Sequence, residues 1–232
     1  MLKDLQVFKI LKVFPKLSSR SMNLKKFTFN PFQENTYVLW DDAKNCAIID
    51  PGCSDVHERN ELVEFIEDQG LKPVKLLNTH CHIDHVLGNK FLAEKYKLGL
   101  EIHKLDLPVL NAVPSYGTNF GFDTGPMVQP SVFLEEGETL HVGSIALKIL
   151  FVPGHSPGSI CFYHVATKQV ISGDALFYGS IGRTDLPGGN HAQLIAAIKS
   201  ELLTLPEDVQ VHSGHGPSTN IGFEKANNPF LR

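Results

Sequence analysis

Three histidines and one aspartate lie within six residues about a third of the way along this sequence, in the run Thr-His-Cys-His-Ile-Asp-His of residues 79–85. Imidazole nitrogens and carboxylate oxygens are the ligands that Zn²⁺ and related first-row ions take in proteins. Alternate side chains of an extended segment share a face, so His80 and His82 are expected to bind one ion together. Asp84 and His85 follow where the chain turns away, and they are expected to serve a second ion. The alternative is a surface loop that is rich in histidine.

Three more residues of ligand type follow in separate segments. His155 stands in a Gly- and Pro-rich turn between two expected strands, and Asp174 and His215 each come shortly after an expected strand. The glycines beside them permit a close approach of the backbone. Each is a weak signal by itself, because an aspartate after a strand is commonly a turn residue. With the first run, they complete a set of seven candidate metal ligands.

A run that reads as a buried strand at 74–78 leads into the first cluster, and a helical pattern at 85–97 follows it. A strand end that opens into a helix is where α/β folds place their sites. Apolar periodicity and turn residues predict further strands at 24–29, 36–40, 46–49, 100–103, 132–134, 138–140, 145–152, 159–163, 169–172 and 209–212. They predict further helices at 54–69, 105–112, 191–203 and 221–230. This order predicts an α+β fold, in which two sheets pack face to face with helices on the outer faces.

Residues 111–131 form the one long stretch without a periodic pattern, and they include Tyr116, Phe120 and Phe122. Loops of this length in compact domains are commonly lids or binding loops. The three aromatic residues favour that interpretation over a disordered insertion.

The composition argues against several classes of protein. A hydrophobic content of 42% suffices for a sizeable core, and a net charge of −4 argues against a nucleic-acid-binding surface. The sequence has no run of 18 apolar residues that would span a membrane. Its four cysteines form no C-x-x-C pair and suggest no disulfide framework. We therefore expect a cytoplasmic protein. Nothing in the sequence indicates an oligomeric state.

We expect one domain over residues 22–232 and an extension over residues 1–21 that lies outside its core. The extension is basic and is broken by Pro15. It lacks the continuous apolar stretch and the cleavage site of a secretory signal. Met22 is therefore expected to be the natural start.

These residues and their order resemble the metallo-β-lactamase superfamily over residues 22–232. The superfamily motif H-x-H-x-D-H is matched within residues 80–85, and its later ligands are matched in the segments G-H-S-P-G, S-G-D and G-H-G. The resemblance implies an αββα sandwich of two mixed sheets. It also implies two divalent metal ions, with Zn as the first choice and Fe or Mn also suited to such ligands. The first ion would take His80, His82 and His155, the second would take Asp84, His85 and His215, and Asp174 would bridge both.

The resemblance also implies a reaction. Two such ions lower the pKa of a shared water, so that hydroxide attacks a substrate carbonyl at neutral pH. Asp84 and Asp174 are the candidate catalytic carboxylates. Asp50 resembles the superfamily aspartate that accepts a hydrogen bond from a ligand imidazole and orients it. The alternative role of Asp50 is that of a turn residue before Pro51.

Within the superfamily the sequence is most similar to the glyoxalase II-like group, through residues 176–189. Arg183 stands where those enzymes have a lysine that contacts glutathione, and Asp185 replaces their tyrosine. The chain ends 17 residues after His215, without their C-terminal helical domain. We therefore expect a compact thioesterase that hydrolyses S-lactoylglutathione or a related acyl thioester. Arg183 and Tyr163 are the candidate substrate contacts, and a structural ion pair of Arg183 with Asp185 is the alternative.

Other activities stay open at this point. A persulfide dioxygenase of the same fold would use one iron held by His80, His155 and Asp174, and a lactonase would use the same fold as well. A β-lactamase is disfavoured because a secretory signal is absent. A non-catalytic binding protein is disfavoured because all seven ligands are present. The expected partner is a small-molecule thioester, with no nucleic acid and no membrane.

Overall fold

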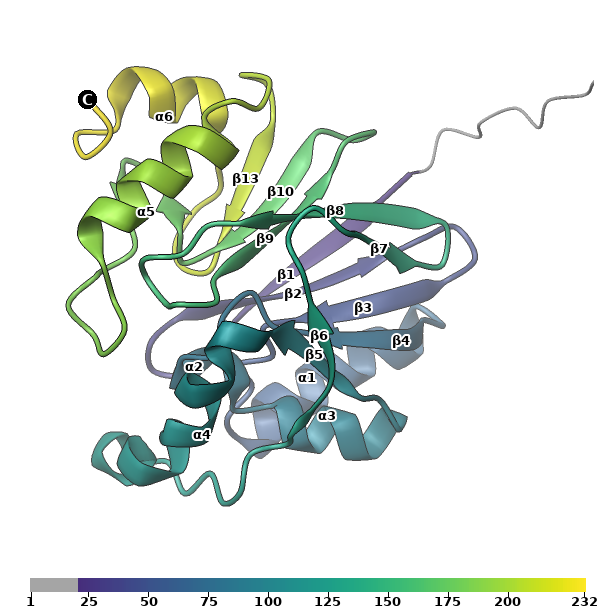
Figure 1. Ribbon diagram of the computed structural model, residues 1–232. Helices are drawn as coiled ribbons and strands as arrows, with labels where there is room; N and C mark the ends of the chain where they lie inside the picture. The colour runs from purple at the N-terminus through teal and green to yellow at the C-terminus, as the bar shows by residue number, and fades with distance from the viewer. Residues whose placement is uncertain (1–20) are drawn as a thin grey trace, which may run out of the picture.

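The computed structural model describes residues 21–232, in which two six-stranded sheets pack face to face with helices on both outer faces (Figure 1). The strand order is β1-β2-β3-β4-β5-β6 in the first sheet and β14-β13-β10-β9-β8-β7 in the second sheet. Strands β1 to β3 pair antiparallel, β3 to β6 pair parallel, and the second sheet is antiparallel except for β10 with β13. The predicted αββα arrangement of two mixed sheets is confirmed.

The parallel strands of the first sheet are joined by helices, which cover its outer face (Figure 1). Its strands are β1 (Asn23–Phe29), β2 (Glu34–Trp40), β3 (Asn45–Ile49), β4 (Lys72–Leu77), β5 (Leu100–His103) and β6 (Pro130–Leu134). The connecting helices are α1 (Val56–Asp68), α2 (Ile83–Val86), α3 (Asn89–Tyr96), the 3₁₀ turn η1 (Lys104–Asp106), α4 (Leu107–Tyr116) and the 3₁₀ turn η2 (Gly117–Phe120).

The second sheet contains the later strands and is covered by the C-terminal helices (Figure 1). Its strands are β7 (Thr139–Val142), β8 (Ile145–Phe151), β9 (Ile160–His164), β10 (Gln169–Gly173), β13 (Gln210–Ser213) and β14 (Thr219–Asn220). A small hairpin and the helical segments complete this half: β11 (Leu176–Phe177), β12 (Ser180–Ile181), α5 (His191–Ala197), the π-helical turn η3 (Ile198–Leu202) and α6 (Ile221–Asn227).

Three apolar clusters correspond to the three interfaces of the sandwich. The central cluster lies between the sheets, and there the alternation predicted for β8 places Ile145, Leu147 and Ile149 toward the first sheet. The other two clusters lie between each sheet and its outer helices. Each large apolar side chain that becomes fully buried contributes roughly 1.5–3 kcal/mol. The packed sheets therefore form a rigid base for the loops at their edges.

The helix predicted at 85–97 is divided in the structure. α2 ends at Val86, and α3 begins at Asn89 after a turn that contains Gly88. The amide of Gly88 donates to the Pro51 carbonyl at 2.7 Å. An added Cβ at Gly88 would lie 2.4 Å from Cys53 Sγ. Close packing against the loop after β3 therefore interrupts the helix, and a periodic pattern does not reveal such a contact.

The stretch expected to lack regular structure is shorter than the sequence indicates. α4 continues to Tyr116 with Pro114 inside it, and η2 follows directly. Because proline removes one backbone hydrogen bond within a helix, the sequence pattern predicts that the helix ends before Pro114. Leu110 and Val113 are fully buried against the first sheet. This burial offsets the unfavourable proline.

The domain boundaries stay a prediction. The extension expected over residues 1–21 lies outside the described residues, apart from Ser21, whose hydroxyl donates to Asp42 at 2.6 Å. Within residues 21–232 no helix combines the length and apolar character that crossing a bilayer requires.

Candidate metal centre

The structure brings the seven candidate ligands together at one edge of the sandwich. They lie after β4, on α2, in the β8–β9 turn, after β10 and after β13. His80, His82, Asp84 and His85 belong to the half that contains the first sheet, whereas His155, Asp174 and His215 belong to the half that contains the second sheet. The role of each as a metal ligand stays a prediction, but their convergence is a property of the fold.

His80, His82 and His155 form the first group. His155 Nε2 lies 2.8 Å from His82 Nδ1 and 3.2 Å from His80 Nε2. A tetrahedral ion bound by nitrogen at about 2.0–2.1 Å would separate such atoms by about 3.3 Å. His80 and His155 are buried, with 1% and 3% of their surface exposed. The three nitrogens therefore fit the ligand set of one ion.

Asp84, His85 and His215 form the second group. Asp84 Oδ2 lies 3.1 Å from His215 Nε2 and 3.5 Å from His85 Nε2. Asp174 lies between the two groups, because its Oδ2 is 3.5 Å from both His155 Nε2 and His215 Nε2. This is the place that the resemblance assigned to a bridging carboxylate.

The second ring nitrogen of several histidines is held by a defined acceptor. His155 Nδ1 donates to the Arg183 carbonyl at 2.8 Å, and His215 Nδ1 donates to the Phe32 carbonyl at 3.0 Å. Because a carbonyl only accepts, these contacts place the proton on Nδ1 and leave Nε2 free as a ligand. The rings are thus oriented before any ion binds.

Asp50 supports the first loop from beneath. Its carboxylate accepts from the Thr79 amide at 2.7 Å and from the Thr79 hydroxyl at 2.6 Å. The same hydroxyl lies 3.1 Å from His80 Nδ1 and accepts from it. Asp50 Oδ2 also lies 3.3 Å from His85 Nδ1. Asp50 has a positive φ of 50°, a strained backbone conformation that tends to occur at functional sites. Its predicted role in orienting ligands fits these contacts and stays a prediction.

The charges of the histidines and carboxylates provide a test of whether a cation fits between them. Burial lowers the pKa of His82 to about 3, so its ring is neutral and has a free lone pair. Burial also disfavours a charged His85, but Asp84 and Asp174 outweigh it and raise the pKa of His85 well above its ordinary value. His85 Nε2 and Asp174 Oδ1 are buried without a hydrogen-bond partner. Such atoms cost about 1–3 kcal/mol each when unpaired. A cation between them would supply the missing partner.

The sequence patterns did not single out several polar residues that support the site. Asn30 Nδ2 donates to the Asp84 carbonyl at 3.0 Å, and Asn78 Nδ2 donates to the His85 carbonyl at 2.8 Å. Glu34 is fully buried, and its Oε1 lies 3.8 Å from His85 Nδ1. These residues stand in turns and at strand ends, where polar side chains are ordinary. Only their burial distinguishes them.

Arg183 and Asp185 pair with each other. Arg183 Nε and Nη2 donate to the two oxygens of Asp185 at 2.7 and 2.8 Å, and both side chains are exposed. This is the structural ion pair predicted from the sequence as the alternative to a substrate contact of Arg183.

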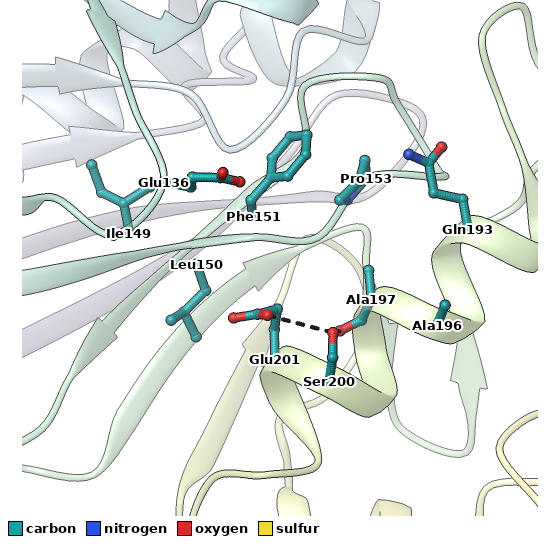
Figure 2. A pocket seen from close by; sticks show the side chains of 11 residues that line it. Glu136, Ile149, Leu150, Phe151, Pro153, Gln193, Ala196, Ala197, Ser200 and Glu201 are labelled. Carbon is teal, nitrogen blue, oxygen red and sulfur yellow. Dashed lines mark hydrogen bonds between the residues drawn. The ribbon is translucent and has the colours of Figure 1, made fainter.

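Tyr163 lies on β9 and is 5% exposed, in the cluster between the second sheet and the outer helices. Its role as a substrate contact stays a prediction. A hollow of about 630 Å³ lies between the end of β8 and α5, with Phe151 on one side and Gln193 on the other (Figure 2). None of the seven candidate ligands lines this hollow, so it is separate from the metal centre.

The sequence profile of the metallo-beta-lactamase superfamily matches residues 29–215. The chain belongs to this superfamily. A Bacillus subtilis protein named probable metallo-hydrolase YqgX is 39% identical over 211 residues, which cover 90% of this chain and 98% of the relative. The Haemophilus influenzae hydroxyacylglutathione hydrolase GloC is 39% identical over 214 residues, with 90% and 98% covered.

Solved structures agree with this assignment. TTHA1623, determined in a di-iron-bound form, is 40% identical with a TM-score of 0.81, over 89% of this chain and 100% of that chain. The BLEG-1 B3 metallo-beta-lactamase is 34% identical with a TM-score of 0.79, over 90% and 99%. The fold and superfamily predicted from the sequence are confirmed. The protein is a hydrolase of a superfamily that binds divalent metal ions.

Proposed function

We propose that this protein is a thioester hydrolase of the glyoxalase II type, similar to hydroxyacylglutathione hydrolases. The observation that carries the proposal is the convergence of seven ligand-type side chains in two groups, with Asp174 between them. The similarity to GloC over almost the whole of both chains supports the thioester specificity. The resemblance of residues 176–189 to the same group supports it independently of the metal ligands.

The two groups would hold two divalent ions. His80, His82 and His155 would bind one ion, Asp84, His85 and His215 would bind the other, and Asp174 would contact both. Such ions lower the pKa of a shared water and polarise an acyl carbonyl. Zinc is our first choice, and iron or manganese suits the same nitrogen and oxygen ligands.

The exposure of the ligands indicates how a substrate would reach them. The side chains of His215 and Asp84 are 27% and 14% exposed, whereas those of His85 and His155 are 0% and 3% exposed. A substrate carbonyl and a water would therefore enter from the side of His215. Asp84 is an ionised carboxylate at neutral pH, because His85 lowers its pKa despite the opposing effect of burial. Asp84 can thus accept the proton of the attacking water, while Asp174 would bind both ions.

The leaving group places few demands on the protein. A thiolate departs readily, so that no separate general acid is needed to protonate it. The proton accepted by Asp84 can pass to solvent through the exposed side of the site. We also propose a small-molecule substrate and a reducing compartment such as the cytoplasm. The free thiols of Cys46, Cys53, Cys81 and Cys161 fit such a compartment.

Metal analysis and a thioester assay test this proposal together. We expect two equivalents of metal per chain and hydrolysis of S-lactoylglutathione, followed by release of the free thiol. Asp174→Ala should bind only one equivalent of metal, and its activity should fall by about 100-fold or more. Asp208→Ala, at an exposed ion pair with Lys168, should retain both.

Parallel assays separate the alternatives. One equivalent of iron with oxygen consumption on a persulfide would identify a dioxygenase, and turnover of lactones alone would identify a lactonase. If fully metallated protein hydrolysed no thioester, the proposed function would be wrong.

A further inference from the structure

Another buried carboxylate, Asp106, joins the two loops that carry the first histidine group. It is fully buried where η1 meets α4. Its Oδ2 accepts from the Cys81 amide at 2.6 Å, and its Oδ1 accepts from the Gly158 amide at 2.6 Å. The Ser156 hydroxyl donates to the same Oδ1.

These donors stand next to the candidate ligands. Cys81 separates His80 from His82, so a fixed Cys81 amide restrains the backbone of both histidines. Ser156 and Gly158 follow His155 in the β8–β9 turn. One carboxylate thus holds both loops at the place where His82 Nδ1 and His155 Nε2 approach to 2.8 Å.

The surroundings of Asp106 indicate a role in geometry. Among the described residues, no cationic side chain forms an ion pair with it. A buried carboxylate is costly unless it is hydrogen-bonded, and here three donors, including two amides, satisfy it. The contact is also tight, because a Cβ added at Gly158 would lie 2.6 Å from the Asp106 amide nitrogen.

Asp106 is itself fixed by the fold. α4 carries Pro108 in its first turn, and its Leu110 and Val113 are fully buried against the first sheet. A side chain at the start of such a helix has a defined position relative to the sheet. Supporting a site from a packed helix rather than from a loop is how ligand geometry is maintained to a fraction of an ångström.

We propose that Asp106 is a positioning residue for the first metal ion, which keeps His80 and His82 at the correct distance from His155. This inference rests on the metal-binding part of the proposed function and is independent of the substrate. Asp106 has no role in the chemical step itself.

Asp106→Asn tests the proposal, with Asp41→Asn as the matched control. Asp41 is 1% exposed and accepts from the Asn45 amide at 2.9 Å and the Ser144 amide at 2.8 Å. It joins two turns at the other end of β2 from the metal centre. The two variants therefore remove comparable hydrogen bonds in different places.

The measurement is the dissociation constant of Zn²⁺, titrated against a competing chelator. We expect Asp106→Asn to raise the Kd of one zinc ion by about 10- to 100-fold and to weaken the visible absorption of the Co²⁺-substituted protein. Asp41→Asn should lower the thermal midpoint without changing the zinc Kd or the Co²⁺ absorption. Wild-type zinc Kd values in Asp106→Asn, or an equal rise in Asp41→Asn, would overturn the proposal.

Ser156→Ala keeps the proposal testable if Asp106→Asn does not fold. This variant removes one donor and keeps both amide contacts, so we expect a smaller rise of about threefold. An unchanged Kd in a folded Ser156→Ala protein would count against the proposal. Zinc affinity is measured without substrate. A wild-type protein that bound zinc but hydrolysed no thioester would therefore refute the thioesterase and leave this inference intact.

Discussion

At the scale of single residues, the site is dominated by an excess of carboxylates around one imidazole. Asp84, Asp174 and Asp50 each place an oxygen within 3.5 Å of a ring nitrogen of His85. In the metal-free protein these charges stabilise a protonated His85, and a bound cation would replace that proton. Metal binding and proton release are therefore linked at this residue.

This linkage predicts how the stability of the metal-free protein depends on pH. His85 has a raised pKa in the folded state. Its stabilising contribution is therefore fully present below the unfolded value of about 6.5 and is lost as pH rises through the raised folded pKa. We expect the thermal midpoints of metal-free wild type and His85→Gln to converge as pH rises above about 6.5 and through the raised folded pKa. A difference that is independent of pH would contradict this account. Zinc affinity of the second group should rise over the same range.

Thr79 predicts a second effect at this scale. Its hydroxyl accepts from His80 and donates to Asp50, so it links the position of one carboxylate to that of a candidate ligand. Thr79→Val keeps the shape and leaves a buried oxygen of Asp50 without a donor. We expect a loss of about 1–3 kcal/mol in the free energy of unfolding and zinc binding weakened by about tenfold. Denaturant titration and zinc competition measure the two quantities. Thr79→Ser retains the hydroxyl and should approach wild type in both.

At the scale of elements, loops that begin at strand ends provide both the candidate ligands and the residues that support them. The turn between β1 and β2 is an example, because the Phe32 carbonyl holds His215 while the Phe32 ring packs 5.6 Å from that of Phe120. Phe120 belongs to residues 111–131, which the sequence predicts to form a lid or binding loop. That stretch therefore contacts the turn that orients a candidate ligand.

The loop after β12 predicts how the thiol carrier is selected. Arg183 is paired with Asp185, and a fully exposed pair of this kind contributes little to stability because solvent screens it. Asp185→Ala should therefore leave the thermal midpoint almost unchanged and free the guanidinium to bind an anionic substrate. We expect a several-fold lower KM for S-lactoylglutathione and an unchanged KM for an uncharged thioester. An equal KM in wild type and variant for both substrates would show that the pair only braces the loop. The backbone carbonyl of Arg183 that accepts from His155 is not altered by this substitution.

At the scale of the whole molecule, the candidate metal centre connects the two halves of the sandwich. The first group takes His80 and His82 from beside the first sheet and His155 from beside the second sheet, and Asp174 joins this group to the second. Ions bound there would cross-link segments that are distant in sequence. Binding to the folded state alone adds stability that grows with metal concentration.

Removal of metal should therefore lower the thermal midpoint. At a free zinc concentration of about 1,000 times Kd, the stabilisation is about 4 kcal/mol. We expect a chelator to lower the midpoint of the wild-type protein by several degrees and re-addition of zinc to restore it. Asp174→Ala should show a much smaller shift. A wild-type midpoint that did not respond to chelator and zinc would contradict a cross-linking role.

The sequence by itself determined the types of the candidate ligands, their order and their places at strand ends, because the spacing of a motif and apolar periodicity are local properties. It also determined the two-sheet arrangement, through alternation such as that of β8. The tertiary structure alone decided which polar residues support the ligands. The roles of Asp106 and Glu34 follow from burial and from contacts with distant segments. The break in the helix at Gly88 has the same origin. Such contacts depend on how the layers pack, and no local pattern records them.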